Sequence, residues 1–489
     1  MPIKPDPTVL APDSLGAIHF IGIGGAGMSG IARMFIEAGH RVSGSDKADG
    51  PYLAALRDLG ATIRIGHDAA NVSELDAAAG DAIVVTSALW EDNPEYVYAK
   101  ANGITVLHRS QALAWLTRGR RLVSVAGAHG KTTSAGMLIS AMIDLGADPS
   151  FVNGGIIQSV GRSAGTGASD IFVIEADESD GSFLFYDTSI ALITNVDSDH
   201  LDHYGSVGAF DAAFGIFADR ASEFIVLSSD DSGARRIGEL IANRTGPIST
   251  RPGNTNSGKT VVTFGESQTA HARVHSIRTA PAGVAFVIDW KGSSYPVALS
   301  VAGRHNAINA AGAFTVLVGM GFDPEAAAAS LASFSGTKRR FELKGEERGV
   351  RVYDDYAHHP SEAAAALSTA RSVVGEGRVI AVHQPHLFSR TKLMSAQFAR
   401  VYEDLADFTI VLDVDGARED PVPGVTGELV SREFMDQTKV AYLPDWDEAA
   451  ARAAGMARDG DIVMTLSCGD VYKIIPQVLR SLSSVPSGG

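Results

Sequence analysis

The segment best suited to chemistry is a glycine-rich turn with a lysine and two threonines, GAHGKTT at Gly127–Thr133. The apolar residues Leu122–Ala126 before this turn predict a buried strand, and the residues after it predict a helix to about Leu145. A turn of this kind exposes backbone N–H groups, and the helix N-terminus adds positive potential, so the turn suits a polyphosphate. We therefore predict that the turn binds ATP or GTP.

The side chains of this turn have distinct expected roles. Lys131 is expected to neutralise the β- and γ-phosphates, while the hydroxyl of Thr132 binds Mg²⁺. The usual pattern G-x-x-x-x-G-K-[ST] requires glycine at position 125, where this chain has Val125, so the match is to a shortened variant. A structural turn with an exposed lysine is the alternative, and the flanking strand and helix argue against it. The other residues expected to contact ATP here are Gly127, Ala128, His129, Gly130 and Thr133.

Two further predicted strands end in polar residues. Glu175 follows the apolar segment Ile171–Ile174, and it is the acidic partner that a magnesium nucleotide needs. His200 follows the segment Ile190–Thr194 and could ligate a second metal, although a single histidine is also common as a structural residue. Ligands bind at the carboxyl ends of strands in open parallel sheets, so we expect both residues near the phosphate turn.

A second glycine-rich turn, GIGGAGMSG, lies near the N-terminus between a predicted strand at Ala17–Ile23 and a predicted helix at Ile31–Ala38. With Asp46 beyond the next strand, it matches the dinucleotide-binding fingerprint in outline, which would suit a nicotinamide dehydrogenase. A glycine turn at a helix N-terminus binds any diphosphate, however, including that of a nucleotide sugar. The residues expected to contact such a ligand are Gly22, Gly24, Gly25, Gly27, Met28, Ser29 and Asp46.

Composition and length limit the class of protein. At roughly 150 residues per domain, 489 residues predict about three domains, and 45% hydrophobic residues supply several cores. The net charge of -16 argues against a nucleic-acid-binding surface. The single cysteine, Cys468, excludes an intrachain disulfide and fits a reducing compartment. Because no membrane span or targeting segment is visible, we expect a cytoplasmic protein without membrane insertion, either a monomer or a weak dimer.

Strand and helix patterns divide the chain into three predicted α/β domains. The turn-rich stretch before the phosphate turn places the first boundary at residues 118 and 119, and strand–helix alternation from Val350 onward places the second at residues 336 and 337. Within the central domain, the alternating segments Val261–Phe264 and Val284–Ile288 follow the turn-rich residues 251–258. They predict an antiparallel insert or an extension of the sheet.

Taken in order, the motifs resemble those of the Mur ligases over nearly the whole chain. The matching segments are GIGGAGMSG, GAHGKTT, FVNGG at Phe151, EADESD at Glu175, TNVDSDHLDHYG at Thr194, GRHNAINAA at Gly303, SGTKRRFE at Ser335, DDYAHHPSE at Asp354 and HQPHLFSRT at His383. The resemblance implies an N-terminal Rossmann-like domain for a UDP-sugar, a central ATPase domain and a C-terminal Rossmann-like domain. It also implies ATP-dependent ligation of L-alanine to UDP-N-acetylmuramate through an acyl phosphate, in the synthesis of peptidoglycan precursors.

The resemblance also assigns roles to residues of the later segments. It implies a second ion at His200, adenine contacts from His305 and Asn306, and closure over ATP by Arg340 and Asp355. For the amino acid the candidates are His359 and Arg390, because an arginine can pair with the alanine carboxylate. This chain departs from the family pattern at Leu387, where some members carry arginine, and at Ser467 and Cys468 in LSCGD.

Three other functions compete with this interpretation. A nicotinamide oxidoreductase leaves the phosphate turn and the third domain without a role. A nucleotide-dependent switch or binding module needs neither a second diphosphate site nor the DDYAHHP segment. A relative that ligates a tripeptide during muropeptide recycling shares the activation chemistry and differs in the acceptor, and comparing the two acceptors would decide between them.

Overall fold

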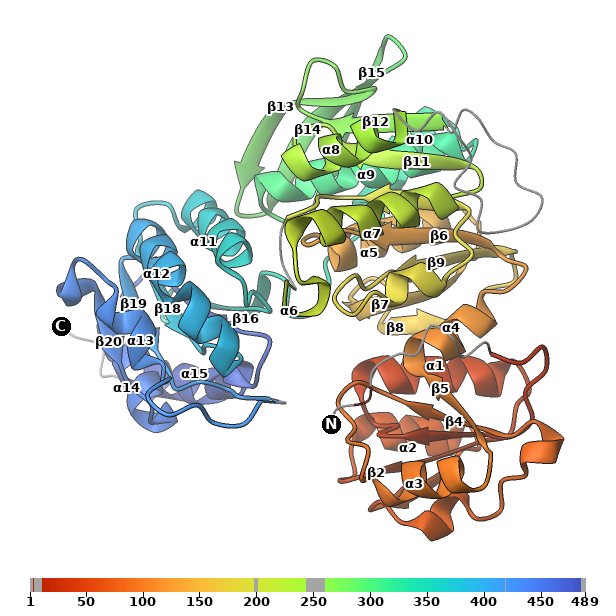
Figure 1. Ribbon diagram of the computed structural model, residues 1–489. Coiled ribbons are helices and arrows are strands. Elements are labelled where there is room, and N and C mark those ends of the chain that lie inside the picture. The colour runs from red at the N-terminus through yellow and green to blue at the C-terminus, as the bar shows by residue number, and fades with distance from the viewer. Residues whose placement is uncertain (1–2, 4–10, 198–200, 243–259, 418, 485–489) are drawn as a thin grey trace. The chain divides into compact units, whose positions relative to one another are not determined.

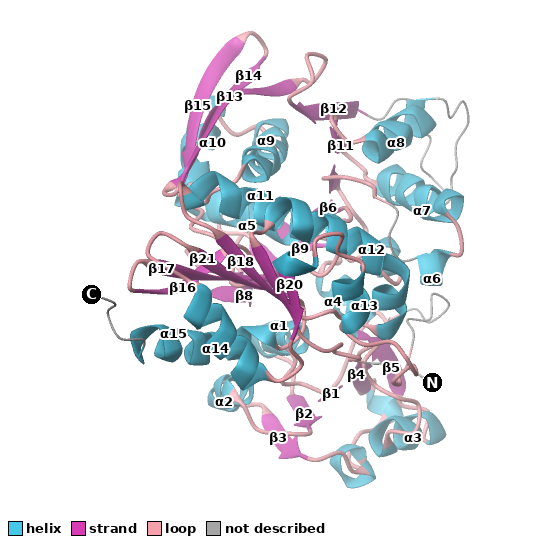
Figure 2. Cartoon of the chain, turned by 90° about the vertical axis from the view of Figure 1, so that its left-hand side faces the viewer, coloured by secondary structure: helices cyan, strands magenta, loops and turns pink. Residues whose placement is uncertain are grey.

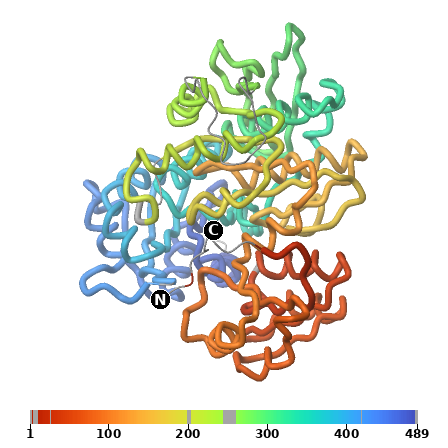
Figure 3. The backbone as a smooth tube through the Cα atoms, turned by 45° about the vertical axis from the view of Figure 1, so that its right-hand side comes forward, coloured from red at the N-terminus to blue at the C-terminus, as the bar shows by residue number. Residues whose placement is uncertain are grey.

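The computed structural model describes residues 3, 11–197, 201–242, 260–417 and 419–484 (Figure 1). The chain builds three sheets one after another along the sequence. Figure 3 traces the backbone, coloured by residue number from red at the N-terminus to blue at the C-terminus. Its residues form two compact units, of which the first comprises 1–275, 287–297 and 308–334 and contains the first sheet and most of the second. The other comprises 276–286, 298–307 and 335–489 and contains the third sheet.

The first sheet is parallel and has five strands in the order β3-β2-β1-β4-β5. Its strands are β1 Ile18–Ile21, β2 Val42–Asp46, β3 Thr62–Ile65, β4 Ala82–Val85 and β5 Thr105–His108. Its helices are α1 Ala26–Glu37, α2 Pro51–Asp58, α3 Pro94–Ala101 and α4 Arg109–Leu116, with 3-10 turns η1 Ala69–Val72 and η2 Ala77–Ala79. The strand order reverses between β1 and β4, and such a switch point leaves a crevice for a ligand at the carboxyl ends.

The second sheet has ten strands in the order β15-β14-β13-β12-β11-β10-β6-β9-β7-β8. They are β6 Arg121–Ala126, β7 Ser150–Ile157, β8 Arg162–Gly165, β9 Ile171–Glu175, β10 Ile190–Ile193, β11 Phe224–Ser228, β12 Thr260–Gly265, β13 Ala272–Ala280, β14 Gly283–Trp290 and β15 Ser293–Leu299. The helices are α5 Lys131–Asp144, α6 Leu201–Tyr204, α7 Val207–Arg220, α8 Ser232–Ala242, α9 Arg304–Gly319 and α10 Pro324–Ser330, with η3 Ser182–Phe185 and η4 Leu331–Ser333. Because β6 lies between β10 and β9, the turns that follow these three strands meet at one edge.

The predicted extension of the central sheet is present. β12, which contains the predicted segment Val261–Phe264, pairs in parallel with β11 and so continues the parallel sheet. The strands β13, β14 and β15 are joined by two-residue turns, a connection that only antiparallel neighbours allow. The turn-rich residues 251–258 lie outside the described residues.

The third sheet has six strands in the order β16-β17-β21-β18-β19-β20, in which only the β16–β17 pair is antiparallel. Its strands are β16 Glu342–Glu347, β17 Val350–Asp355, β18 Val379–His383, β19 Phe408–Val411, β20 Val440–Tyr442 and β21 Ile462–Leu466. Its helices are α11 Pro360–Val374, α12 Phe388–Leu405, α13 Glu428–Arg432, α14 Trp446–Met456 and α15 Ile475–Ser484, with η5 Gln437–Lys439 and η6 Val471–Ile474. Figure 2 shows α11 and α12 on one face of this sheet and α14 and α15 on the other, in agreement with two separate clusters of buried residues.

The first two sheets share a hydrophobic core. One cluster of buried residues runs from Phe20 and Phe35 through Leu122 to Phe214. Helix α1 approaches β8 so closely that a Cβ atom on Gly30 would lie 2.8 Å from the Cβ of Ala164. The predicted α/β class and the three sheets are confirmed, while the domain boundaries at 118/119 and 336/337 stay predictions. Among the described residues, every helix is too short or too polar to cross a membrane.

Candidate active site

The phosphate turn connects the buried strand β6 to helix α5, as its sequence predicts. Gly127 and Gly130 both have positive φ angles, of 138° and 80°, which residues with side chains rarely adopt. A Cβ atom on Gly127 would lie 2.1 Å from Oγ1 of Thr194, and one on Gly130 would lie 2.7 Å from Oδ1 of Asn309. Both positions therefore require glycine for conformation and for space.

Residues after β10 hold the backbone of the turn. The N–H of His129 donates to Oδ1 of Asn195 at 2.9 Å, and its carbonyl accepts from Nδ2 of Asn195 at 2.8 Å. The hydroxyl of Thr194 also donates to this carbonyl at 2.6 Å. Because His129 is fixed from both sides, the turn has its shape before any phosphate binds.

Lys131 lies in a shell of acceptors. Its ammonium donates to the carbonyls of Gly127 and Ala128 at 2.6 and 3.2 Å and to Oε1 of Glu178 at 3.0 Å. Burial opposes the charge, but Glu178, Glu175 and nearby Asp177 raise the pKa of Lys131 above its ordinary value. The lysine is therefore charged at neutral pH, as a phosphate-binding cation must be.

Glu178 is a buried carboxyl group whose ionised form is disfavoured by burial. Its side chain is 1% exposed, and burial raises its pKa to about 7 although Lys131 acts in the opposite direction. A carboxylic acid that titrates near neutral pH beside a phosphate-binding lysine is typical of a functional site. Its position three residues after Glu175 was visible in the sequence, but the direction of its side chain was not.

Thr132 and Glu175 come together as the sequence predicts. The hydroxyl of Thr132 donates to Oε1 of Glu175 at 3.0 Å, and the N–H of Gly154 donates to Oε2 of the same carboxylate at 2.7 Å. A hydroxyl and a carboxylate are the hard oxygen ligands that Mg²⁺ prefers. Thr132 lies in the first turn of α5, where phosphates would bind, and Glu175 is the last residue of β9. These residues therefore fit a magnesium ion. The predicted second ligand, His200, lies outside the described residues.

The first glycine turn is held by the neighbouring strand. The N–H groups of Gly22 and Ile23 both donate to the carbonyl of Ser45, at 2.8 and 3.1 Å. The N–H of Gly24 donates to Oδ2 of Asp46 at 2.8 Å. Asp46, predicted to contact the ligand, therefore also fixes the conformation of the turn. Its contact with a ligand stays a prediction, as do those of Gly22, Gly24, Gly25, Gly27, Met28 and Ser29.

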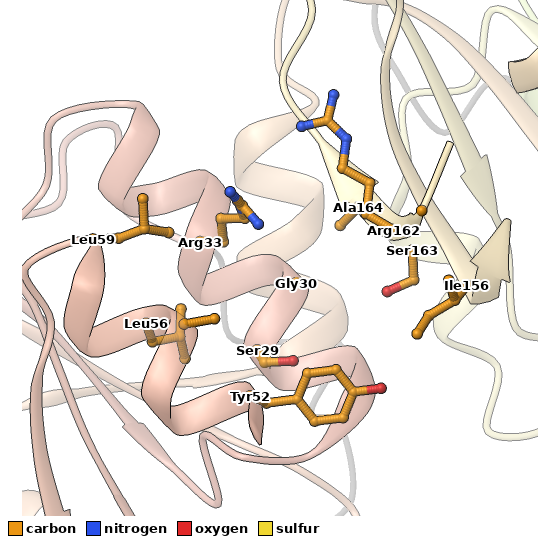
Figure 4. A pocket seen from close by; sticks show the side chains of 12 residues that line it. Ser29, Gly30, Arg33, Tyr52, Leu56, Leu59, Ile156, Arg162, Ser163 and Ala164 are labelled. Carbon is orange, nitrogen blue, oxygen red and sulfur yellow. The ribbon is translucent and has the colours of Figure 1, made fainter. Parts of the chain in front are cut away.

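A small pocket lies beside helix α1, which follows the first glycine turn. Ser29, Gly30 and Arg33 of α1 face Ile156, Arg162, Ser163 and Ala164 of the β7–β8 hairpin, and Tyr52 and Leu56 of α2 complete the wall (Figure 4). Of the residues predicted to contact a diphosphate, Ser29 alone lines this pocket among the described residues. The pocket is therefore formed where the first sheet packs on the central one.

In the second unit, Arg340 lies just before β16, and Asp355 is the last residue of β17. Asp355 accepts hydrogen bonds from the N–H groups of Phe341 and Ala357, both at 2.8 Å. Burial raises the pKa of Asp355 to about 6, with Arg340 opposing the change. The guanidinium of Arg340 lies 5.2 Å from the centre of the Tyr356 ring and 4.0 Å from a Glu362 oxygen. These contacts fix the segment that the resemblance assigns to closure over ATP.

The segment assigned to adenine forms the start of α9. The amide nitrogen of Asn306 donates to the carbonyl of Ala302 at 2.7 Å, and its buried Oδ1 has no hydrogen-bond partner among the described residues. Burial, together with the charge of Arg340, lowers the pKa of His305 to about 4. His305 is thus neutral at physiological pH, and the amide oxygen of Asn306 can accept a hydrogen bond.

The candidate alanine ligands lie at the N-termini of α11 and α12. His359 caps α11, with Nδ1 2.6 Å from the hydroxyl of Ser361. Arg390, in the first turn of α12, is partly buried and forms no ion pair with another described residue. Leu387, which departs from the family pattern, is 6% exposed and has a φ of 70°, a strained conformation for leucine. The second departure, Cys468, is a thiol at neutral pH because burial raises its pKa to about 12.

Comparison with known proteins finds the same family along most of the chain. Three models of the Mur ligase family match in sequence order. "Mur ligase family, catalytic domain" matches residues 17–121, "Mur ligase middle domain" residues 125–317, and "Mur ligase, glutamate ligase domain" residues 339–469.

Individual relatives agree with these matches. A UDP-N-acetylmuramate–L-alanine ligase of Clavibacter sepedonicus is 62% identical over 486 residues, covering 99% of this chain and 97% of the relative. The ligase of that name from Paenarthrobacter aurescens (strain TC1) is 47% identical, covering 96% and 98%. The crystal structure of UDP-N-acetylmuramate–alanine ligase from Thermotoga maritima has a TM-score of 0.77 at 25% identity, covering 95% and 98%. A murein peptide ligase from Psychrobacter arcticus 273-4 shares the fold, with a TM-score of 0.70 at 23% identity over 96% and 100% of the two chains.

Proposed function

Because the chain belongs to the Mur ligase family, we propose that it is an ATP-dependent ligase that joins L-alanine to the carboxylate of UDP-N-acetylmuramate. The observation that carries this function is the 62% identity, over 99% of the chain, to a relative of that name. The reaction supplies a precursor of peptidoglycan. The tripeptide ligase of muropeptide recycling has less support, because the relatives at 62% and 47% identity are both named as alanine ligases.

The chemistry requires activation of a carboxylate. Transfer of the γ-phosphoryl group of ATP to the muramoyl carboxylate gives an acyl phosphate, and the amine of L-alanine then displaces phosphate through a tetrahedral intermediate. Negative charge develops on the transferred group and on the tetrahedral oxygen, so cations held in place stabilise both steps. Lys131 is the cation that we assign to the β- and γ-phosphates, on the basis of its charge and its position at the start of α5.

We assign the magnesium ion of this reaction to Thr132 and Glu175, whose oxygens already lie 3.0 Å apart. A bound Mg²⁺ neutralises phosphate charge and orients the oxygens of the transferred group. Glu175→Gln should raise the Mg²⁺ concentration needed for ATP binding, which a fluorescent nucleotide can measure without turnover. Thr132→Ser, which keeps the hydroxyl, is the matched control. An unchanged Mg²⁺ dependence in Glu175→Gln would remove this assignment. The second ion at His200 stays a prediction.

The remaining assignments belong to the third sheet and to α9. We place the adenine beside His305 and Asn306, on the basis of the available amide oxygen of Asn306. The closing contacts with ATP fall to Arg340 and Asp355. We assign the alanine carboxylate to Arg390 and His359, which lie at the N-termini of α12 and α11. The domains to which these residues belong are proposed to span residues 1–118, 119–336 and 337–489.

Phosphate release tests the function directly. The purified protein should release phosphate from ATP when UDP-N-acetylmuramate and L-alanine are both present, and mass spectrometry should find the alanyl product. Omitting either substrate is the control. No phosphate release with all three substrates would overturn the proposed function. Replacing L-alanine by the tripeptide should give little product, and a preference for the tripeptide would favour the recycling enzyme instead.

A further inference from the structure

Arg109, the first residue of α4, lies beside the first glycine turn. A Cβ atom placed on Gly27 would be 3.5 Å from Nη1 of Arg109, so the guanidinium faces the backbone of this turn directly. Helix α1 begins at Ala26, and its N-terminus adds positive potential at the same place. The first N–H groups of a helix have no acceptor within the helix, so a guanidinium beside them is well suited to bind a diphosphate.

The same guanidinium contacts the ATP-binding segment. Nη2 of Arg109 lies 3.1 Å from Oδ2 of Asp177, which stands between Glu175 and Glu178 in the chain. The other oxygen of Asp177 accepts from the N–H of Ser179 at 3.0 Å, which holds the carboxylate in place. One side chain therefore touches the turn of the first sheet and the acidic segment of the second.

The start of α4 is rigid enough to hold Arg109 at this position. His108 caps the helix, and its N–H donates to Oε1 of Gln111 at 2.8 Å in a reciprocal capping arrangement. Burial lowers the pKa of His108 to about 4, so this neighbour is neutral at physiological pH. The positive charge at this corner of the helix is therefore that of Arg109.

The pair between Arg109 and Asp177 is open to competition. The two side chains are 35% and 38% exposed, and pairs with this exposure contribute little to stability. A diphosphate carries more negative charge than one carboxylate and can accept both arms of the guanidinium. A ligand on the turn can therefore take the guanidinium from Asp177.

We propose that Arg109 binds the diphosphate of the nucleotide sugar and exchanges Asp177 for it, so that occupancy of the first site frees a carboxylate beside the ATP site. The inference rests on the proposed function, which supplies the nucleotide sugar. Asp177 is then a competitor of the ligand. It is also the residue through which the first site acts on the segment EADESD, which contains Glu175 and the Glu178 that pairs with Lys131.

Calorimetric titration with UDP-N-acetylmuramate and with UDP, in the absence of ATP, tests the exchange. Arg109→Ala should weaken binding of both ligands by tenfold or more, and Arg109→Lys should weaken it less. Asp177→Asn should tighten binding by about two- to fivefold, the range expected when a weak ion pair no longer competes. In the double variant Arg109→Ala/Asp177→Asn, the gain should disappear.

A matched control comes from a second ion pair of similar exposure. Arg121 and Glu223 are paired at 2.6 Å with side chains 30% and 36% exposed, at the opposite end of β6 from the phosphate turn. Arg121→Ala should leave both affinities unchanged. Asp177→Asn that weakens or does not alter binding would overturn the exchange, because a merely structural pair predicts no gain. If the wild-type protein bound neither ligand, the proposed function itself would fail.

Discussion

The ammonium nitrogen of Lys131 lies 3.0 Å from Oε1 of Glu178, a carboxylate whose side chain is 1% exposed. The same nitrogen donates to two carbonyls of its own turn. Phosphates that bind at the turn must therefore replace acceptors that already hold the lysine. Glu178 therefore links the charge of the phosphate turn to the acidic segment after β9.

Lys131→Ala should abolish phosphate release, because the charge that stabilises the transferred phosphoryl group is lost. Binding of UDP-N-acetylmuramate should stay within about twofold of the wild-type value. The first glycine turn follows a strand of the first sheet, whereas Lys131 follows a strand of the second. The prediction is met if the variant releases no phosphate from ATP and its calorimetric titration with UDP-N-acetylmuramate is unchanged. Normal turnover in this variant would remove Lys131 from the ATP site.

Glu178→Gln should change how stability depends on pH. Burial raises the pKa of Glu178 from 4.5 to about 7, so the folded protein binds a proton that the unfolded chain has released. The wild-type protein should therefore lose stability relative to the variant as pH rises from about 4.5 to 7, with no further loss above that range. The difference should be on the order of 1–3 kcal/mol, measured by urea unfolding at pH 5 and pH 8.

The control for this experiment is an exposed carboxylate. A hydrogen bond from Arg57 lowers the pKa of Asp49, so Asp49→Asn should not reproduce the trend between pH 5 and pH 8. If Glu178→Gln and the wild-type protein showed parallel stability across this range, the carboxyl of Glu178 would not titrate as described.

Gly127→Ala should damage both the fold and the site. The new Cβ atom would lie 2.1 Å from Oγ1 of Thr194, in a backbone conformation with a φ of 138°. We expect a loss of about 2 kcal/mol or more in the free energy of unfolding, together with weaker ATP binding. Gly455→Ala is the matched control, because Gly455 lies in α14 with open space around it, and alanine there should be neutral or slightly stabilising. Equal effects at both positions would contradict the steric argument.

The sequence predicted the parts of the site that depend on local pattern. An apolar strand, a glycine turn and a helix identified β6 and α5, and the rule that ligands bind at the carboxyl ends of strands brought Glu175 to Thr132. Boundaries were less accurate: α1 begins at Ala26, before the predicted start at Ile31, because glycines and serine in its first turn obscure the apolar pattern. The family resemblance supplied the order of domains, which no single motif contains.

Other features depend on side-chain direction and could not be read from spacing. Glu178 and Asp177 are neighbours in EADESD, yet one pairs with Lys131 and the other with Arg109. Asn195 holds the phosphate turn through a residue 66 positions away. Asp46 was predicted to contact the ligand, and its hydrogen bond to the N–H of Gly24 shows a second role in shaping the turn. Each case requires the tertiary structure.

Arg390→Ala should raise the KM for L-alanine and leave the KM for ATP unchanged. Arg390 is partly buried, lies at the start of α12 and makes no ion pair with another described residue, so its guanidinium is available to a substrate carboxylate. Loss of a bidentate, charge-assisted contact should lower kcat/KM for L-alanine by about 10- to 100-fold, and Arg390→Lys should recover only part because lysine lacks the planar fork. Arg400→Ala, an exposed arginine on the same helix, should be neutral. If Arg390→Ala raised the KM for ATP and not that for L-alanine, the guanidinium would belong to the nucleotide site, and the amino acid would need another cation.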